Sequence, residues 1–298
     1  FVTLIRVMII TGIALAITAA ALGTVSKQLI AASEYYRESY MFYLGAFLNA
    51  IVGPAVDASA YAFAPQVIVA PFACLDVILF AITAPVTLRW QKERLTYMHF
   101  VAVLLVTIGA IHTSGYGELT DHLMSIRDLE KQIFFRPTSL AYMSFELMLV
   151  LAVLSSLRQG HMHPAVRGIS LGIVAGMLMG NVFFTKGLLD IIRQSISSGD
   201  ASAWMRPTPY FLLLATLGGP FCGHLLMRKG LAEYKGVFMV TIFEGAHIVA
   251  ACLSGCIVME EMADATWHSY KRYWFGVVLI VSGLVTINIA ANDARLIP

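Results

Sequence analysis

The chain has 298 residues, of which 58% are hydrophobic and 13% are charged, and its formal net charge is +2. A soluble domain carries about 25% charged residues, so this composition excludes an ordinary soluble protein, and the small net charge does not indicate nucleic-acid binding. Apolar stretches of about 20 residues, long enough to cross a bilayer, predict an integral membrane protein that has the lipid bilayer as a partner; they do not indicate which membrane.

These apolar stretches predict an all-α polytopic membrane protein with about nine transmembrane helices, because only helices and closed barrels satisfy backbone hydrogen bonds in lipid. We expect the spans at residues 4–31, 40–63, 65–88, 96–114, 139–157, 166–192, 209–227, 236–259 and 273–291. The first stretch lacks a cleavage-site context, and we interpret it as a span and not as a signal peptide.

One long connection, residues 117–136, has a helical pattern of its own. Leu119, Leu123, Ile126, Leu129 and Ile133 recur at three- and four-residue steps, and the opposite face is charged. The pattern predicts an amphipathic helix in the lipid headgroup region. The alternative is a short soluble helix that packs on neighbouring loops.

A weak internal repeat divides the chain. The sequence GIALAI at 12–17 precedes Lys27, and the similar GISLGI at 168–173 precedes Lys186. A Gly-Pro pair follows in the next span of each part, at 53–54 and at 219–220. The repeat predicts two four-helix halves on either side of an unpaired fifth span. The halves have opposite orientation if the fifth span belongs to the first half, a common transporter plan. Lys27 and Lys186 would then be pseudo-symmetric.

Ionisable side chains inside the spans are costly to insert and are usually functional. The candidates for a substrate or cation site are Lys27, Asp57, Asp76, Lys186, Glu244 and His247. The functional interpretation is that the carboxylates line a polar cavity between the halves. The alternative is that they pair with the lysines and only fix the packing, as Asp190 could do four residues after Lys186.

Other reactive side chains carry less information. We interpret Glu146 in the fifth span as peripheral, and His112 and His224 as packing or interface residues. The four cysteines lie in apolar segments and are interpreted as buried free thiols. The sequence has no zinc-hydrolase motif, nucleophile elbow, phosphate-binding loop or dinucleotide fingerprint in a suitable context. It therefore predicts a protein that is not an enzyme and has no cofactor.

Several motifs resemble the NIPA-type magnesium transporters of the drug/metabolite transporter superfamily. They are AYAFAPQVIVAP at 60–71, KERL at 92–95, VTIF at 240–243, the acidic pair Glu260-Glu261, FG at 275–276 and SG at 282–283. The resemblance implies the two-repeat fold of that superfamily, Mg²⁺ as the substrate, and Asp57 and Asp76 as metal-facing residues. Two positions depart from the family pattern. Pro54 stands where relatives often have an acidic residue, and Ile242 follows Thr241 where they usually have proline, which puts a second-half kink in doubt.

The repeat and the resemblance together predict one transmembrane domain: a first repeat half at 1–115, the interfacial helix at 116–137, the fifth span at 138–158 and a second half at 159–298. The leading hypothesis is a secondary transporter or facilitator of Mg²⁺ or another small cation, with a midplane site between the repeats. One alternative is a small-metabolite transporter, in which Lys27 and Lys186 bind an anionic group. The other is a transport-inactive accessory subunit of a larger membrane complex. A polar cavity between the halves favours transport, and a sealed apolar interface favours the accessory subunit.

Overall fold

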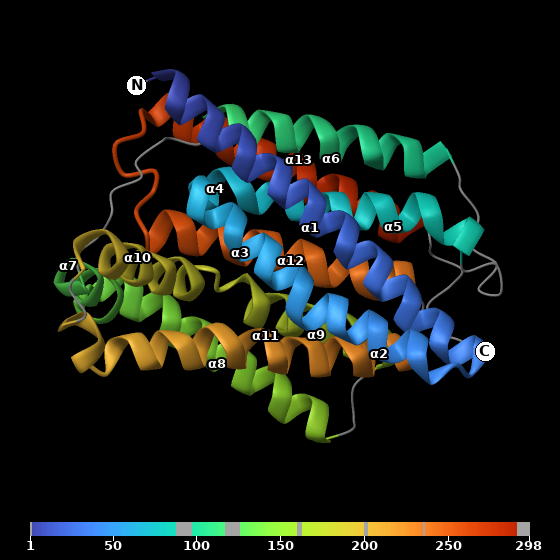
Figure 1. The fold of residues 1–298 in the computed structure, drawn as a ribbon. Helices are drawn as coiled ribbons and strands as arrows, with labels where there is room; N and C mark the ends of the chain where they lie inside the picture. Colours follow the sequence, from blue (N-terminus) through green and yellow to red (C-terminus); the bar gives the residue numbers. More distant parts are fainter. Residues whose placement is uncertain are drawn as a thin grey trace.

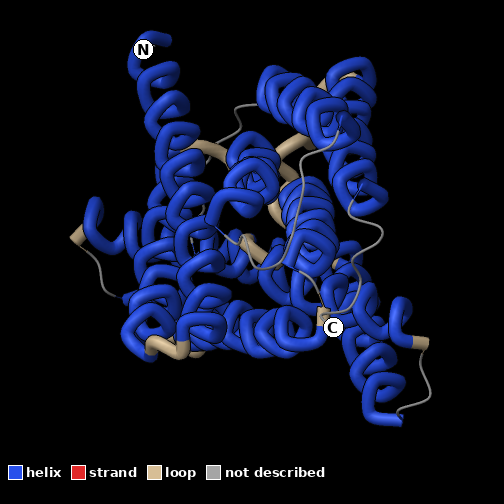
Figure 2. Tube along the Cα trace, turned by 90° about the vertical axis from the view of Figure 1, so that its right-hand side faces the viewer, coloured by secondary structure: helices blue, strands red, loops and turns tan. Residues whose placement is uncertain are grey.

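The computed structural model describes residues 2–87, 97–116, 126–159, 163–199, 202–234 and 236–290, and every regular element in these ranges is helical (Figure 1, Figure 2). The α-helices are α1 (Val2–Tyr36), α2 (Ser39–Phe47), α3 (Gly53–Phe63), α4 (Gln66–Val69), α5 (Cys74–Thr87), α6 (Tyr97–Tyr116), α7 (Ile126–Glu130), α8 (Pro137–Gln159), α9 (Pro164–Gly180), α10 (Phe183–Ser198), α11 (Thr208–Glu233), α12 (Gly236–Ile257) and α13 (Trp267–Ala290).

Six stretches of the described chain are long and apolar enough to cross a membrane. They are Val7–Ile30, Gln66–Thr83, Pro137–Arg158, Val166–Ser198, Thr208–Leu231 and Phe238–Ile257. The protein is therefore an integral membrane protein, as the composition predicts. The spans expected at 40–63, 96–114 and 273–291 are also helical but do not meet this criterion, so the total of nine stays a prediction. The first of these is divided between α2 and α3, and the apolar part of α6 is only Phe100–Thr113.

Three of the apolar stretches are broken. A π-helical turn, η1 (Leu48–Val52), separates α2 from α3, directly before Gly53 and Pro54. Proline lacks an N–H and disturbs the preceding helical turn, which agrees with the position of this π-helical turn before Pro54. A 3₁₀ turn, η2 (Ala70–Ala73), separates α4 from α5 at Pro71. The third break, at residues 181–182, separates α9 from α10.

The eighth predicted span, residues 236–259, has no break at the position where relatives usually have proline. α12 is one continuous helix through Thr241 and Ile242, so the missing proline corresponds to a missing break. α11 is also continuous, although Pro220 lies inside it.

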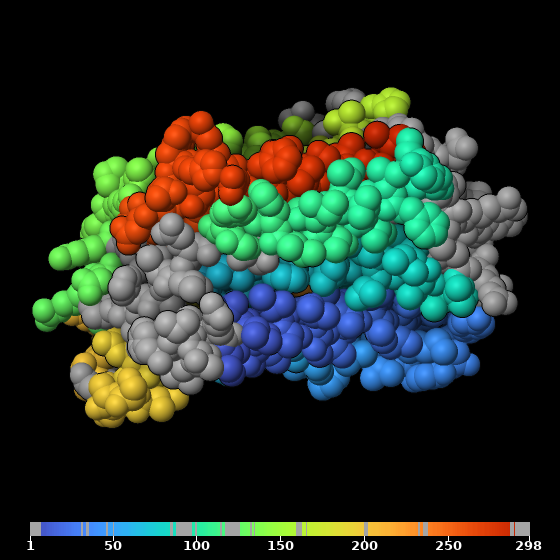
Figure 3. Space-filling view, turned by 90° about the horizontal axis from the view of Figure 1, so that it is seen from above, coloured from blue at the N-terminus to red at the C-terminus, as the bar shows by residue number. Residues whose placement is uncertain are grey.

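Helix packing follows a similar scheme in the two parts of the chain. α1 packs on α3 and α5, and α9 packs on α11 and α12. α6 and α13 join the two parts along their length, as Figure 3 shows from above. Small residues allow this contact, because a Cβ added to Gly109 would lie 2.7 Å from the carbonyl oxygen of Gly276. Superposition of the halves, and of Lys27 on Lys186, stays a prediction.

The predicted interfacial helix is described only in its second part, since residues 117–125 lie outside the described residues. The described part forms α7 and a π-helical turn, η4 (Lys131–Phe135). Leu129 and Ile133 are fully buried and lie against Gly187 of α10. Glu130 accepts hydrogen bonds from Arg206 and Thr208, each at 2.7 Å. This part therefore packs on the protein, and its position relative to the headgroups stays a prediction.

Candidate functional site

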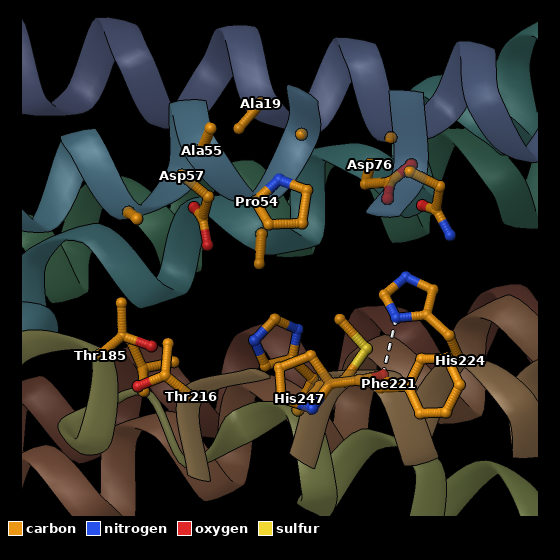
Figure 4. A pocket seen from close by; sticks show the side chains of 18 of the residues that line it. Ala19, Pro54, Ala55, Asp57, Asp76, Thr185, Thr216, Phe221, His224 and His247 are labelled. Carbon is orange, nitrogen blue, oxygen red and sulfur yellow. Dashed lines mark hydrogen bonds between the residues drawn. The ribbon is translucent and has the colours of Figure 1, made fainter. Parts of the chain in front are cut away.

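A cavity of about 810 Å³ lies between α1, α3 and α5 on one side and α9 to α12 on the other (Figure 4). Small and apolar residues form most of its lining. The polar lining residues are Lys27, Asn49, Asp57, Tyr61, Asp76, Thr185, Thr216, His224, Glu244 and His247. The cavity therefore contains five of the six residues predicted as a substrate or cation site, and it lies between the two parts of the chain.

Lys27 of α1 lies between two carboxylates at this cavity. Its ammonium forms an ion pair with Asp76 of α5, and it donates a hydrogen bond to Oε1 of Glu244 in α12 at 2.7 Å. The exposed fractions of the three side chains are only 5%, 9% and 5%. A buried charge is tolerated when it is paired and hydrogen-bonded. The contacts in this cluster therefore offset the cost of placing three ionisable side chains inside membrane spans.

Each of these carboxylates has a second partner on its other oxygen. The Thr24 hydroxyl donates a hydrogen bond to Oδ1 of Asp76 at 2.7 Å, and Nδ1 of His247 lies 3.3 Å from Oε2 of Glu244. Gly23 lets Asp76 approach α1, because a Cβ at that position would lie 2.7 Å from Oδ2 of Asp76. Both carboxylates are thus fixed from behind, with one oxygen of each turned to Lys27.

Asp57 lies on α3 and is half-buried. Figure 4 shows Asp57 and Asp76 at separate places on one wall of the cavity, with Pro54 between them, while His247 lies on the facing wall. No described residue donates a hydrogen bond to the Asp57 carboxylate or forms an ion pair with it. Among the described residues, the Asp57 carboxylate thus lines the cavity without a hydrogen-bond donor or an ion-pair partner.

The predicted metal pair Asp57 and Asp76 is not assembled into one cluster. In the described part of the chain, no group of three or more His, Cys, Asp or Glu side chains is arranged to hold a metal ion. Mg²⁺ does not require such a group, because it usually keeps several waters and binds one or two carboxylates. The metal-binding role of Asp57 and Asp76 stays a prediction.

Lys186 is the one predicted site residue that does not line the cavity. It donates a hydrogen bond to Oε1 of Glu261 at 2.5 Å, and both side chains are buried. Its role in substrate binding stays a prediction with no support from this position.

Glu146 lies in a separate, almost entirely apolar cavity of about 480 Å³ between α8, α9, α12 and α13. The residue is 6% exposed, and its Oε1 has no hydrogen-bond partner. Its position apart from the central cavity agrees with its interpretation as peripheral to the candidate site.

Sequence reasoning missed several polar residues of the site. Thr24 lies three residues before Lys27, and this helical spacing could have identified it as a neighbour of the cluster. His224 was interpreted only as a packing or interface residue, but it lines the cavity, and its Nδ1 lies 2.8 Å from the carbonyl oxygen of Pro220. Thr185 and Thr216 carry no sequence signal that separates them from other threonines in spans.

No solved structure was found to match the chain. A protein named "Probable magnesium transporter NIPA1" from Arabidopsis thaliana is 25% identical over 239 residues, which cover 79% of this chain and 68% of that protein. Residues 2–293 match the family described as "Magnesium transporter NIPA". This match covers every described helix, and the chain therefore belongs to the NIPA family of magnesium transporters.

Proposed function

We propose that the protein is a secondary transporter or facilitator that moves Mg²⁺ through the central cavity. Family membership supports a membrane transporter and Mg²⁺ as its cargo. The observation that carries the proposal is the cavity itself, where Asp57, Asp76 and Glu244 come from different helices on both sides. Three carboxylates and one lysine line this cavity, and the excess of negative charge attracts a cation.

The size of the cavity suits an ion that retains its water. A water molecule occupies about 30 Å³ in the liquid, so a shell of about six waters needs about 180 Å³, well below the cavity volume of about 810 Å³. Mg²⁺ gives up water reluctantly, and a space of this size with three carboxylates in its wall lets it bind through its waters or through one or two carboxylates.

The alternatives receive less support from this geometry. An anionic metabolite would need a free cationic group, but Lys27 is already paired with two carboxylates. An accessory subunit without transport activity has no need of a cavity with three carboxylates between its two parts.

Mg²⁺ uptake into proteoliposomes that contain only the purified protein and a trapped Mg²⁺ indicator tests the proposal. The wild type should take up Mg²⁺, and Asp57→Asn should raise the half-saturating concentration tenfold or more, which corresponds to about 1.4 kcal/mol of lost binding free energy. Glu146→Gln is the matched control, because it also neutralises a carboxylate in a span but outside the cavity, and uptake should be unchanged.

The contrary result is a wild type that moves neither Mg²⁺ nor any other small cation or metabolite. If that chain also copurifies in fixed ratio with other membrane subunits, and Asp57→Asn affects only stability or assembly, the accessory-subunit alternative holds instead.

A further inference from the structure

Lys27 occupies the point where carboxylates from the two parts of the chain converge. Asp76 reaches its ammonium from α5 in the first part and Glu244 from α12 in the second, with a hydrogen bond of 2.7 Å to Glu244. Because Thr24 and His247 hold the outer oxygens, the inner oxygens remain directed at a single central position. Two carboxylate oxygens thus converge on one point, and the protein's own ammonium occupies it.

We propose that Lys27 is a tethered competitor for the transported ion: the divalent cation must displace its ammonium from Asp76 and Glu244, and this competition excludes monovalent cations. The inference rests on the proposed Mg²⁺ transport and assigns to Lys27 the selectivity of that same site.

The charges explain the selectivity. At equal distance and dielectric constant, a divalent ion interacts with the two carboxylates twice as strongly as the ammonium does. A monovalent ion gains no such advantage, since it exchanges one positive charge for another. The ammonium is also covalently attached, so it stays close to the two carboxylates and returns to them readily. Na⁺ and K⁺ must displace it with no gain in charge, whereas a divalent ion has the stronger attraction.

The cavity gives the displaced side chain a place to go. Lys27 itself lines the cavity, and lysine has a flexible four-carbon stem. Asp57, which has no described hydrogen-bond donor or ion-pair partner, lies in the same cavity. The ammonium can thus leave Asp76 and Glu244 without losing all access to negative charge.

A purely structural ion pair is the alternative, and the chain contains one for comparison. Lys186 and Glu261 are also buried and paired, with side-chain exposed fractions of 6% and 2%. Lys186, however, does not line the cavity. Replacing each lysine by methionine removes one buried positive charge in both cases, but only Lys27 lines the proposed ion path.

Thermal unfolding of the purified full chain, titrated with MgCl₂ or KCl at ionic strength held constant with N-methylglucamine chloride, separates the two roles. In Lys27→Met, the half-stabilising Mg²⁺ concentration should fall at least tenfold below that of the wild type, and K⁺ should also stabilise the protein. Lys186→Met should show the wild-type Mg²⁺ dependence and no response to K⁺.

The competition is refuted if Lys27→Met and the wild type have the same Mg²⁺ dependence and neither responds to K⁺, or if the two methionine variants respond alike. If Lys27→Met does not fold, the double variant Lys27→Met/Glu244→Gln replaces it. This variant leaves only one buried carboxylate, Asp76, without the Lys27 charge, whereas Lys27→Met leaves two. K⁺ should stabilise this double variant at concentrations that leave the wild type unaffected, and no response to K⁺ would overturn the proposal.

The transport assay distinguishes this inference from the proposed function. If wild-type proteoliposomes take up Mg²⁺ and Lys27→Met has the same half-saturating concentration and cation selectivity, only the role of Lys27 fails. If the wild type moves no Mg²⁺ but Lys27→Met binds Mg²⁺ more tightly, transport fails while the competition by Lys27 stands.

Discussion

The carboxylate of Glu261 accepts a hydrogen bond from the backbone N–H of Val67 at 2.8 Å, although the two residues belong to different parts of the chain. It also accepts the N–H of Gln66 at 3.1 Å and a hydrogen bond from Lys186. These two N–H groups begin α4 and have no partner within that helix. Glu261 therefore fixes the start of the segment that carries Asp76 to the cavity and connects it to α10.

Replacement of Glu261 by glutamine should lower the free energy of unfolding by about 3 kcal/mol, because it breaks the buried ion pair with Lys186 and removes the charge that accepts the two N–H groups of α4. Unfolding of the detergent-solubilised protein, followed by circular dichroism, measures the loss. Glu260→Gln is the control. Its carboxylate pairs with Arg136 and is 39% exposed, so its loss should be below about 1 kcal/mol. Equal losses in the two variants would contradict a special role for Glu261.

Gly176 sets the distance between α9 and α12. A Cβ at this position would lie 2.2 Å from the carbonyl oxygen of Phe243 and 2.8 Å from Cβ of Ala246. Gly176→Ala should therefore lower the free energy of unfolding by about 1–3 kcal/mol. Because α12 also carries Glu244, the variant should weaken Mg²⁺ uptake as well.

Gly115→Ala in α6 is the matched substitution, since its Cβ would meet no atom within 4 Å. It should change stability by no more than about 1 kcal/mol, in the stabilising direction expected for alanine in a helix. A Gly176→Ala protein that unfolds at the wild-type temperature would show that the two helices separate without cost.

The sequence predicts the helices well because bilayer-length apolar runs have few alternatives to helix. A π-helical turn precedes Gly53 and Pro54, where proline has a local effect. The break at residues 181–182 contains neither proline nor glycine. It follows Gly180, where a Cβ would lie 2.5 Å from Ala250 of α12. Gly180 and Asn181 are residue types that often end helices, but glycine is also common inside membrane spans, so the sequence alone does not distinguish this position from the other glycines.

For the candidate site as well, the sequence identifies individual residues better than it identifies their contacts. Lys27, Asp76 and Glu244 are identifiable because an unpaired charge in a span is costly, so they are expected to meet one another. The spacing of Lys186 suggested Asp190 as its partner, whereas the structure adds Glu261, which is 75 residues away. Sequence spacing identifies neighbours on the same helix. It gives no information about a contact with Glu261, which lies in the loop after α12.

Thr24 should act as a positioning residue for Asp76. Its hydroxyl donates to Oδ1 of that carboxylate at 2.7 Å, and hydrogen bonds to charged groups contribute about 1.5–3 kcal/mol. Thr24→Val should raise the half-saturating Mg²⁺ concentration about tenfold in the proteoliposome assay and leave the maximal rate less affected. Thr18→Val, on the same helix, removes a hydroxyl that bonds only to its own backbone at Ala14, and uptake should be unchanged. If both variants transport as the wild type does, Thr24 does not position the site.

The bidentate pair between Arg167 and Glu233 should give stability that depends on pH. Arg167 donates to the two carboxylate oxygens of Glu233 at 2.9 and 3.0 Å, joining the start of α9 to the end of α11. These hydrogen bonds hold the pKa of Glu233, which lies beyond the apolar stretch of α11, below its ordinary value. The folded state therefore binds a proton at Glu233 less readily than the unfolded state does. The contribution of the pair is fully present above the unfolded glutamate pKa of about 4.3, and it disappears as pH falls through the lower folded value.

Glu233→Gln should accordingly lower the free energy of unfolding by less than about 1 kcal/mol at pH 7, because the pair is partly exposed to solvent. The difference from the wild type should shrink toward zero as the pH is lowered from 5 to 3 (roughly the range in which a glutamate with a lowered pKa takes up its proton). Melting temperatures of both proteins, measured side by side across this range, test the expectation. A difference that stays constant down to the lowest pH would mean that the carboxylate charge contributes nothing and that the variant acts through packing alone.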